Sequence, residues 1–132
     1  MIIREINGEI INTKKVYIHD DVLLSLDFCR QEKEMNLKFI RYNDSKKYIM
    51  RFSNVIGFTM TACDFWGASE CILDFEYISL NKRILIPELQ KKHLSISNLS
   101  NNTLYDSCME TLFTFSSGDQ LRIACETIEI ID

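Results

Sequence analysis

The side chains that could carry nucleophilic chemistry in this 132-residue chain are few and widely separated. Nucleophilic catalysis needs a cysteine or serine beside a base that a third group orients. Cys63, His19 and Asp20 supply these residue types, but no local motif joins them, and the second histidine, His93, stands alone. We therefore predict no catalytic residues and a protein that is not an enzyme.

The five cysteines follow no metal-binding or disulfide pattern. Their number is odd, their spacings are wide, and no C-x-x-C pair occurs, so neither a zinc ribbon nor a disulfide framework is expected. Each lies in or beside an apolar segment, which favours small buried thiols in a reducing compartment. They are Cys29, Cys63, Cys71, Cys108 and Cys125. We predict no metal site.

Phosphate-binding loops require glycines at fixed offsets, so that backbone N–H groups can approach the anion. The chain has only four glycines, and they form neither a Walker motif nor a dinucleotide-binding fingerprint. Asp74 and Glu76 share one face of a predicted strand, as glycosidase carboxylates can, but alternating outward acids are the simpler explanation. No cofactor is predicted.

An acidic segment with an aromatic loop is the most suggestive binding feature. Residues 52–81 hold four acids and no base, and Asp64-Phe65-Trp66-Gly67 places the only tryptophan in a predicted loop. Aromatic side chains on anchored loops are frequent binding anchors, and an acidic region attracts and orients a basic partner. Alternatively, Trp66 plugs the end of the β-structure and the acids are solvated strand faces. The predicted partner-binding residues are Asp64, Phe65, Trp66, Glu70, Asp74 and Glu76.

A basic segment leaves nucleic-acid binding as an alternative. Residues 30–51 hold seven basic residues against three acidic ones. OB-like folds bind single-stranded nucleic acids with basic and aromatic side chains. The candidate residues are Lys38, Arg41, Tyr42, Lys46 and Lys47. The net charge of −4 argues against this alternative.

The elements that position these residues are predicted to be strands, because the dominant period of the apolar pattern is two residues. Apolar residues alternate with polar ones, as in strands with one buried face. Ser53 to Gly57 interrupts the alternation as a predicted bend or bulge. The predicted inward sets are Leu24, Leu26, Phe28; Met35, Leu37, Phe39; Tyr48, Met50, Phe52; Phe58, Met60, Ala62; and Cys71, Leu73, Phe75, Tyr77.

Turn and helix signals complete the pattern. Asn7-Gly8 predicts a hairpin near the N-terminus, and residues 116–119 predict another between the strands 112–115 and 121–128. Pro87 and Glu88, followed by bases and His93, favour a short helix near 87–93. We predict a mainly β fold with a single domain over residues 1–132. It is an antiparallel β-sandwich or partly closed barrel of about seven to nine strands with that one helix.

No signal peptide or membrane segment is recognisable. The acid Glu5 follows soon after the N-terminal methionine, and no apolar run approaches the roughly 18 residues of a membrane helix. We expect a cytoplasmic protein with no membrane partner, and the sequence leaves its oligomeric state open.

Three fragments stand out by their order along the chain: His19-Asp20, FSNVIGF at 52–58 and FSSGDQLRI at 115–123. Together they resemble small all-β bacterial domains that serve as immunity proteins in polymorphic-toxin loci, and the resemblance spans about residues 17–130. It implies a stoichiometric binder that neutralises a cognate toxin domain, often a nuclease with a basic active site, through an acidic surface. No site residue transfers, because such interfaces diverge with their toxins.

A further alternative is a small-molecule-binding or enzymatic β-barrel. Its cavity would lie inside the barrel, near Cys63, His19 and Trp66.

Overall fold

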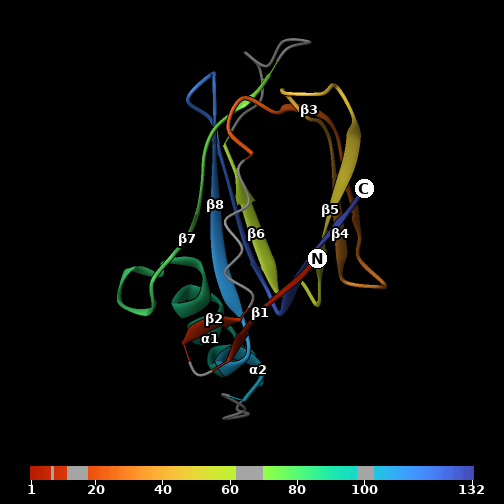
Figure 1. The fold of residues 1–132 in the computed structure, drawn as a ribbon. Helices are drawn as coiled ribbons and strands as arrows, with labels where there is room; N and C mark the ends of the chain where they lie inside the picture. The colour runs from red at the N-terminus through yellow and green to blue at the C-terminus, as the bar shows by residue number, and fades with distance from the viewer. Residues whose placement is uncertain (7, 12–17, 62–69, 98–102) are drawn as a thin grey trace.

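The computed structural model describes residues 1–6, 8–11, 18–61, 70–97 and 103–132. Within these ranges the chain forms ten strands and three helical segments, drawn in Figure 1. The strands are β1 (Ile2–Ile6), β2 (Glu9–Ile11), β3 (Val22–Cys29), β4 (Glu34–Ile40), β5 (Lys47–Ser53), β6 (Gly57–Met60), β7 (Ile72–Tyr77), β8 (Met109–Phe115), β9 (Gln120–Cys125) and β10 (Thr127–Ile131). The helical segments are η1 (Leu80–Lys82), α1 (Leu85–Ser97) and α2 (Thr103–Asp106).

The strands form two antiparallel sheets that face each other (Figure 1). The order is β2-β1-β10-β5-β4-β3 in the six-stranded sheet and β6-β9-β8-β7 in the four-stranded sheet. The predicted mainly β sandwich is confirmed, and the described strands do not close into a barrel. The described part has more strands than predicted, partly because the single strand expected at 121–128 is divided at Glu126 into β9 and β10.

The chain crosses between the sheets at two adjacent corners. β5 leads into β6 through the predicted bend at 53–57, and β9 leads into β10 through Glu126. Two backbone hydrogen bonds join the corners: Ile56 N–H donates to Ala124 O at 2.9 Å, and Glu126 N–H donates to Ser53 O at 3.1 Å. Strands that change sheets at bends hold the two layers together at one side of a sandwich.

The space between the sheets is filled by apolar side chains. The inward faces predicted for β4 and β5 are confirmed, since all six of their predicted residues are at most 3% exposed. The ring of Phe113, on β8, lies at the centre of this core, with its centroid 6.0 Å from that of Phe39 and 6.1 Å from that of Phe52. Burial of this surface is the main force that holds the layers together.

Three predicted strand faces are wrong in part. In the set predicted at 58–62, Phe58 and Met60 are 36% and 42% exposed because β6 is an edge strand, and Ala62 lies outside the described residues. In the other two faces the cause is a β-bulge. The alternation predicts Leu73 and Leu24 inward, yet each is 43% exposed. The register of β7 against β8 shifts between Ile72 and Asp74, and that of β3 against β4 shifts beside Leu24. A bulge adds one residue to one strand and reverses the phase of the alternation beyond it. Ile72, predicted outward, is therefore fully buried.

The predicted helix is confirmed and is longer than 87–93. α1 begins at Leu85 and packs on the outer side of β6 and β9. Gly57 permits this close approach, because a Cβ at its position would lie 2.7 Å from Leu89 Cδ1. The three helical segments and the β1–β2 hairpin gather at one end of the sandwich (Figure 1), which we call the helical end. No helix in the described part of the chain is long and apolar enough to span a membrane.

Candidate functional site

Strand β7 carries two acids on the outer face of the four-stranded sheet. Phe75 and Tyr77 pack against the core from the other face of the strand, so the alternating Asp74 and Glu76 must point outward. Both acids are exposed. Within the described residues no hydrogen bond or ion pair holds either carboxylate, so both are available to another molecule.

Exposed apolar side chains flank these acids in the sequence. Leu73, the extra residue of the β7 bulge, is 43% exposed. Leu80 in η1 and Ile84 just after it are 61% and 54% exposed. Apolar side chains beside charged ones are typical of protein interfaces, where an apolar centre is surrounded by a polar rim. We call Leu73, Asp74 and Glu76 the β7 face.

Glu70 does not share the exposure of the other two predicted acids that the structure describes. It is 6% exposed, and its Oε1 accepts hydrogen bonds from Ser117 N–H at 2.8 Å and Ser116 Oγ at 3.1 Å. Its main-chain carbonyl accepts from Leu23 N–H at 2.9 Å. Through these hydrogen bonds Glu70 joins the β8–β9 turn to the start of β3. Its position between these two elements buries it.

The remaining predicted contact residues, Asp64, Phe65 and Trp66, lie outside the described residues, as does Cys63. Their contribution to binding stays a prediction from the sequence. The internal cavity expected near Cys63, His19 and Trp66 depends on the same segment. Of that set the structure describes only His19, whose Nδ1 lies 3.1 Å from Asp20 Oδ2, with side chains 45% and 43% exposed.

A layer of buried charges lies at the helical end, and sequence reasoning missed it. Glu5 on β1 and Arg83 after η1 form an ion pair whose side chains are 2% and 6% exposed. Arg83 Nε and Nη1 also donate to the carbonyl oxygens of Ile78 at 3.3 Å and Cys108 at 3.1 Å. No sequence motif signals this pair, because its members are 78 residues apart and meet only in the folded chain.

Glu110 forms the second pair of this layer and caps helix α1. It is fully buried and lies 2.6 Å from the guanidinium of Arg122. Its carboxylate accepts hydrogen bonds from Ile84 N–H at 3.0 Å and Ile86 N–H at 2.9 Å. These groups at the helix start lack partners within the helix itself. The only sign of this role in the sequence is one acid inside the apolar stretch 108–113.

The environment of Glu110 keeps it ionised. Burial raises the pKa of its carboxyl group, but the N–H groups of Ile84 and Ile86 and the guanidinium of Arg122 outweigh burial and lower the pKa below its usual 4.5. The carboxylate is therefore charged at neutral pH and fixes the start of α1 on the sheet.

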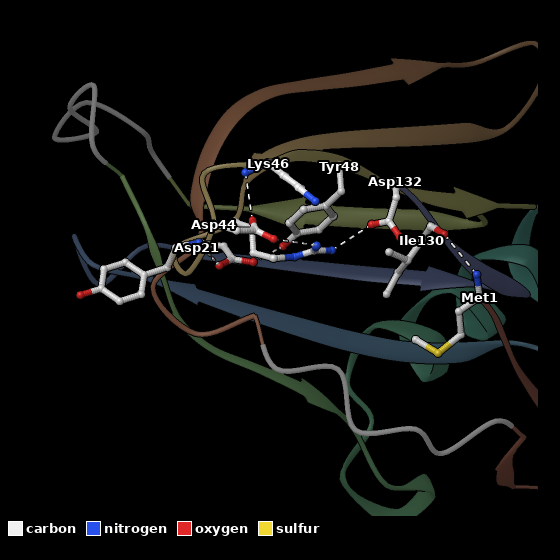
Figure 2. Close-up of polar contacts among 9 residues, drawn as sticks. Met1, Asp21, Asp44, Lys46, Tyr48, Ile130 and Asp132 are labelled. Carbon is white, nitrogen blue, oxygen red and sulfur yellow. Dashed lines mark hydrogen bonds and ion pairs between the residues drawn. The ribbon is translucent and has the colours of Figure 1, made fainter.

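Asp21 forms another buried polar contact, next to the β4–β5 turn (Figure 2). It is 2% exposed, and its carboxylate accepts hydrogen bonds from the Tyr48 hydroxyl at 2.5 Å and from Tyr42 N–H at 2.8 Å. Burial and the bond to Asp21 raise the pKa of Tyr48 well above its usual value. This phenol stays protonated and holds the 18–21 segment against β5.

Arg41, in the predicted nucleic-acid segment, forms ion pairs with Asp44 and Asp132, both labelled in Figure 2. Its Nη2 lies 2.9 Å from Asp132 Oδ1, and its Nη1 lies 3.6 Å from Asp44 Oδ2. Its guanidinium carbon lies 5.1 Å from the centroid of the Tyr48 ring. The other candidates, Lys38, Tyr42, Lys46 and Lys47, are exposed. Asp44 and Asp132 thus neutralise part of the positive charge that would bind a nucleic acid.

The described cysteines are free thiols of different exposure. Cys29 is exposed and Cys71 is half-buried, whereas Cys108 and Cys125 are buried. Burial raises the pKa of Cys108 to about 12 and that of Cys125 well above its usual value, so both are unreactive thiols at neutral pH. Among the described residues, no three His, Cys, Asp or Glu side chains are placed to bind one metal ion.

No protein-family model matches the sequence, and no curated protein matches it.

Proposed function

We propose that this chain is a non-catalytic binding protein that neutralises a cognate bacterial toxin domain in the cytoplasm. The observation that carries the proposal is the β7 face, where two exposed carboxylates without partners among the described residues lie beside an exposed leucine. A strand held in a packed sheet presents these groups in a fixed arrangement, which lowers the entropy lost on binding. The expected partner has a basic surface, such as the active site of a nuclease.

Charge complementarity is the physical basis of this preference. The two β7 carboxylates attract a basic patch before contact and orient its approach. Leu73 supplies apolar area that becomes buried in the complex. A toxin whose basic groups bind nucleic acid would then be blocked, because the same groups cannot contact both ligands.

Co-expression in a bacterial host tests the function. The candidate toxin is the C-terminal domain of a large reading frame next to the gene for this chain. We expect that domain to arrest growth when produced alone and growth to resume when this chain is produced with it. Tagged chain should also capture that domain from native cells in a one-to-one ratio at several salt concentrations. Continued arrest together with failure to capture the domain would contradict the proposal.

A matched pair of double variants tests the surface. D74K/E76K reverses the charge of the β7 face, and D27K/E32K makes the same change in net charge at exposed positions on the β3–β4 hairpin. We expect D27K/E32K to restore growth and D74K/E76K to fail. Equal rescue by both variants would place the interface elsewhere.

A further inference from the structure

A cavity of about 360 Å³ opens at the helical end. This volume is in the range of small-molecule sites in proteins. The cavity lies between η1, the first turns of α1, α2 and the β1–β2 turn. It is lined by Gly8, Leu80, Arg83, Ile86, Pro87, Gln90, Tyr105 and Asp106. It does not lie between the sheets, where apolar side chains pack densely.

The polar wall of the cavity is formed by a fixed arginine. The side chain of Arg83 is 6% exposed, and three groups hold it: the carboxylate of Glu5 and the carbonyl oxygens of Ile78 and Cys108. A guanidinium has five N–H groups, and these three contacts use one on each nitrogen. Two N–H groups, one on each Nη atom, therefore have no hydrogen bond among the described residues and can donate to an oxygen atom of a ligand.

The ion pair behind this wall has further unused hydrogen-bonding capacity. Glu5 Oε1 is buried and has no hydrogen-bond partner among the described residues. Buried carboxylate oxygens are rarely left in that condition. Glu5 is not one of the residues that line the cavity, so the groups that a ligand can reach here are the donors of Arg83 and not this oxygen.

Charge determines which ligands the cavity can accept. The negative charge of Glu5 balances the positive charge of Arg83, and Asp106, which also lines the cavity, has no ion pair among the described residues. An anion would be repelled by Asp106 and would gain little from an arginine that is already paired. The aliphatic side chains of Leu80 and Ile86, together with Pro87 and the Tyr105 ring, suit an apolar body.

We propose that this cavity binds a small uncharged molecule with an apolar body and a primary carboxamide. The carboxamide oxygen accepts hydrogen bonds from Arg83, and its N–H groups donate to the Asp106 carboxylate or the Gln90 side-chain oxygen. The ligand site is separate from the β7 face and does not depend on the proposed function.

A matched ligand series tests the proposal by two-dimensional ¹H–¹⁵N NMR titration of the whole chain. Benzamide carries the proposed group, benzoate replaces it with an anion, and N,N-dimethylbenzamide keeps the oxygen but removes both donors. We expect benzamide to shift the amide signals of Gly8, Leu80 and Gln90, and to bind about tenfold more tightly than either relative. Equal or tighter binding of benzoate would overturn the charge argument, and no shift with any of the three would overturn the site.

Two tryptophan substitutions locate the binding without touching the buried ion pair. Leu80→Trp places a large ring at the wall of the cavity, and Leu24→Trp makes the same change at an exposed position on β3. We expect L80W to weaken benzamide binding at least about tenfold and L24W to leave it unchanged. Equal affinity in both variants would place the ligand outside this cavity. Thermal unfolding of both variants confirms that each is folded.

Discussion

The acids at the helical end and the acids of the β7 face differ in what surrounds them. Glu5 and Glu110 are buried, and each is paired with an arginine, whereas Asp74 and Glu76 are exposed with no partner among the described residues. A buried carboxylate that binds groups of its own chain stabilises the fold and is not available to a partner. An exposed carboxylate without such partners contributes little to stability and is available for binding. Substitutions of the buried acids should therefore lower the free energy of unfolding. Substitutions of Asp74 and Glu76 should instead weaken binding and leave that free energy nearly unchanged.

The largest loss of stability is expected from Glu110→Gln. The substitution leaves Arg122 without its counter-charge and disturbs the cap of α1, and breaking one partner of a buried ion pair costs about 3–5 kcal/mol. Urea denaturation followed by circular dichroism measures the free energy of unfolding. Glu88→Gln, at an exposed position on the same helix, is the control and should change it by less than about 0.5 kcal/mol. Similar values for the two variants would contradict the role assigned to Glu110.

Acid should weaken the same contact in the unmodified chain. The pKa of Glu110 is lower in the folded protein than its usual 4.5. Its stabilising contribution is therefore complete above that pH and is lost as the pH falls through the folded-state pKa. Urea denaturation between pH 6 and about pH 3 should show declining stability, with a shallower decline in E110Q. Parallel declines in the two proteins would show that other groups dominate the acid response.

Glu70→Ala should have a smaller effect. It removes the acceptor for Ser117 N–H and Ser116 Oγ, and hydrogen bonds to a charged group contribute about 1.5–3 kcal/mol. The free energy of unfolding should fall by about that amount. Binding to the toxin domain should persist at temperatures where the variant is folded. A loss of binding in the folded E70A variant would indicate that Glu70 belongs to the contact surface.

The smallest change in stability is expected from D74N/E76N. Neither carboxylate has a partner among the described residues, so the free energy of unfolding should stay within about 0.5 kcal/mol of the unmodified value. Urea denaturation at neutral pH measures it. A loss above about 2 kcal/mol would mean that these acids are structural and would remove the contrast between the two regions.

The period-two alternation predicted much of the fold, because burial of one strand face is a local property of the sequence. It placed the inward residues of β4 and β5 correctly. It misplaced Leu73 and Leu24 because a bulge depends on the partner strand and changes the phase without a change in composition. Helix α1 was recognised from Pro87 and Glu88, but its actual start is fixed by Glu110, 24 residues from Ile86.

The candidate site was predictable only in part for the same reason. Asp74 and Glu76 could be placed on an outward face from alternation alone. Glu70 is also an acid and lies two residues before the buried Ile72. Its burial depends on contacts with the β8–β9 turn, which form only in the folded chain. The Glu5–Arg83 pair and the adjoining cavity join segments that are distant in the sequence, so no local pattern could reveal them.

The most direct test of the proposed binding face is the dissociation constant of the complex with the candidate toxin domain, measured by isothermal titration calorimetry. The unmodified chain, D74K/E76K and D27K/E32K are compared at low and physiological salt. We expect D74K/E76K to raise the dissociation constant at least about tenfold, and D27K/E32K to change it less than about twofold. Added salt should weaken the unmodified complex more than the D74K/E76K complex. Equal dissociation constants for the two double variants would contradict the assignment of binding to the β7 face.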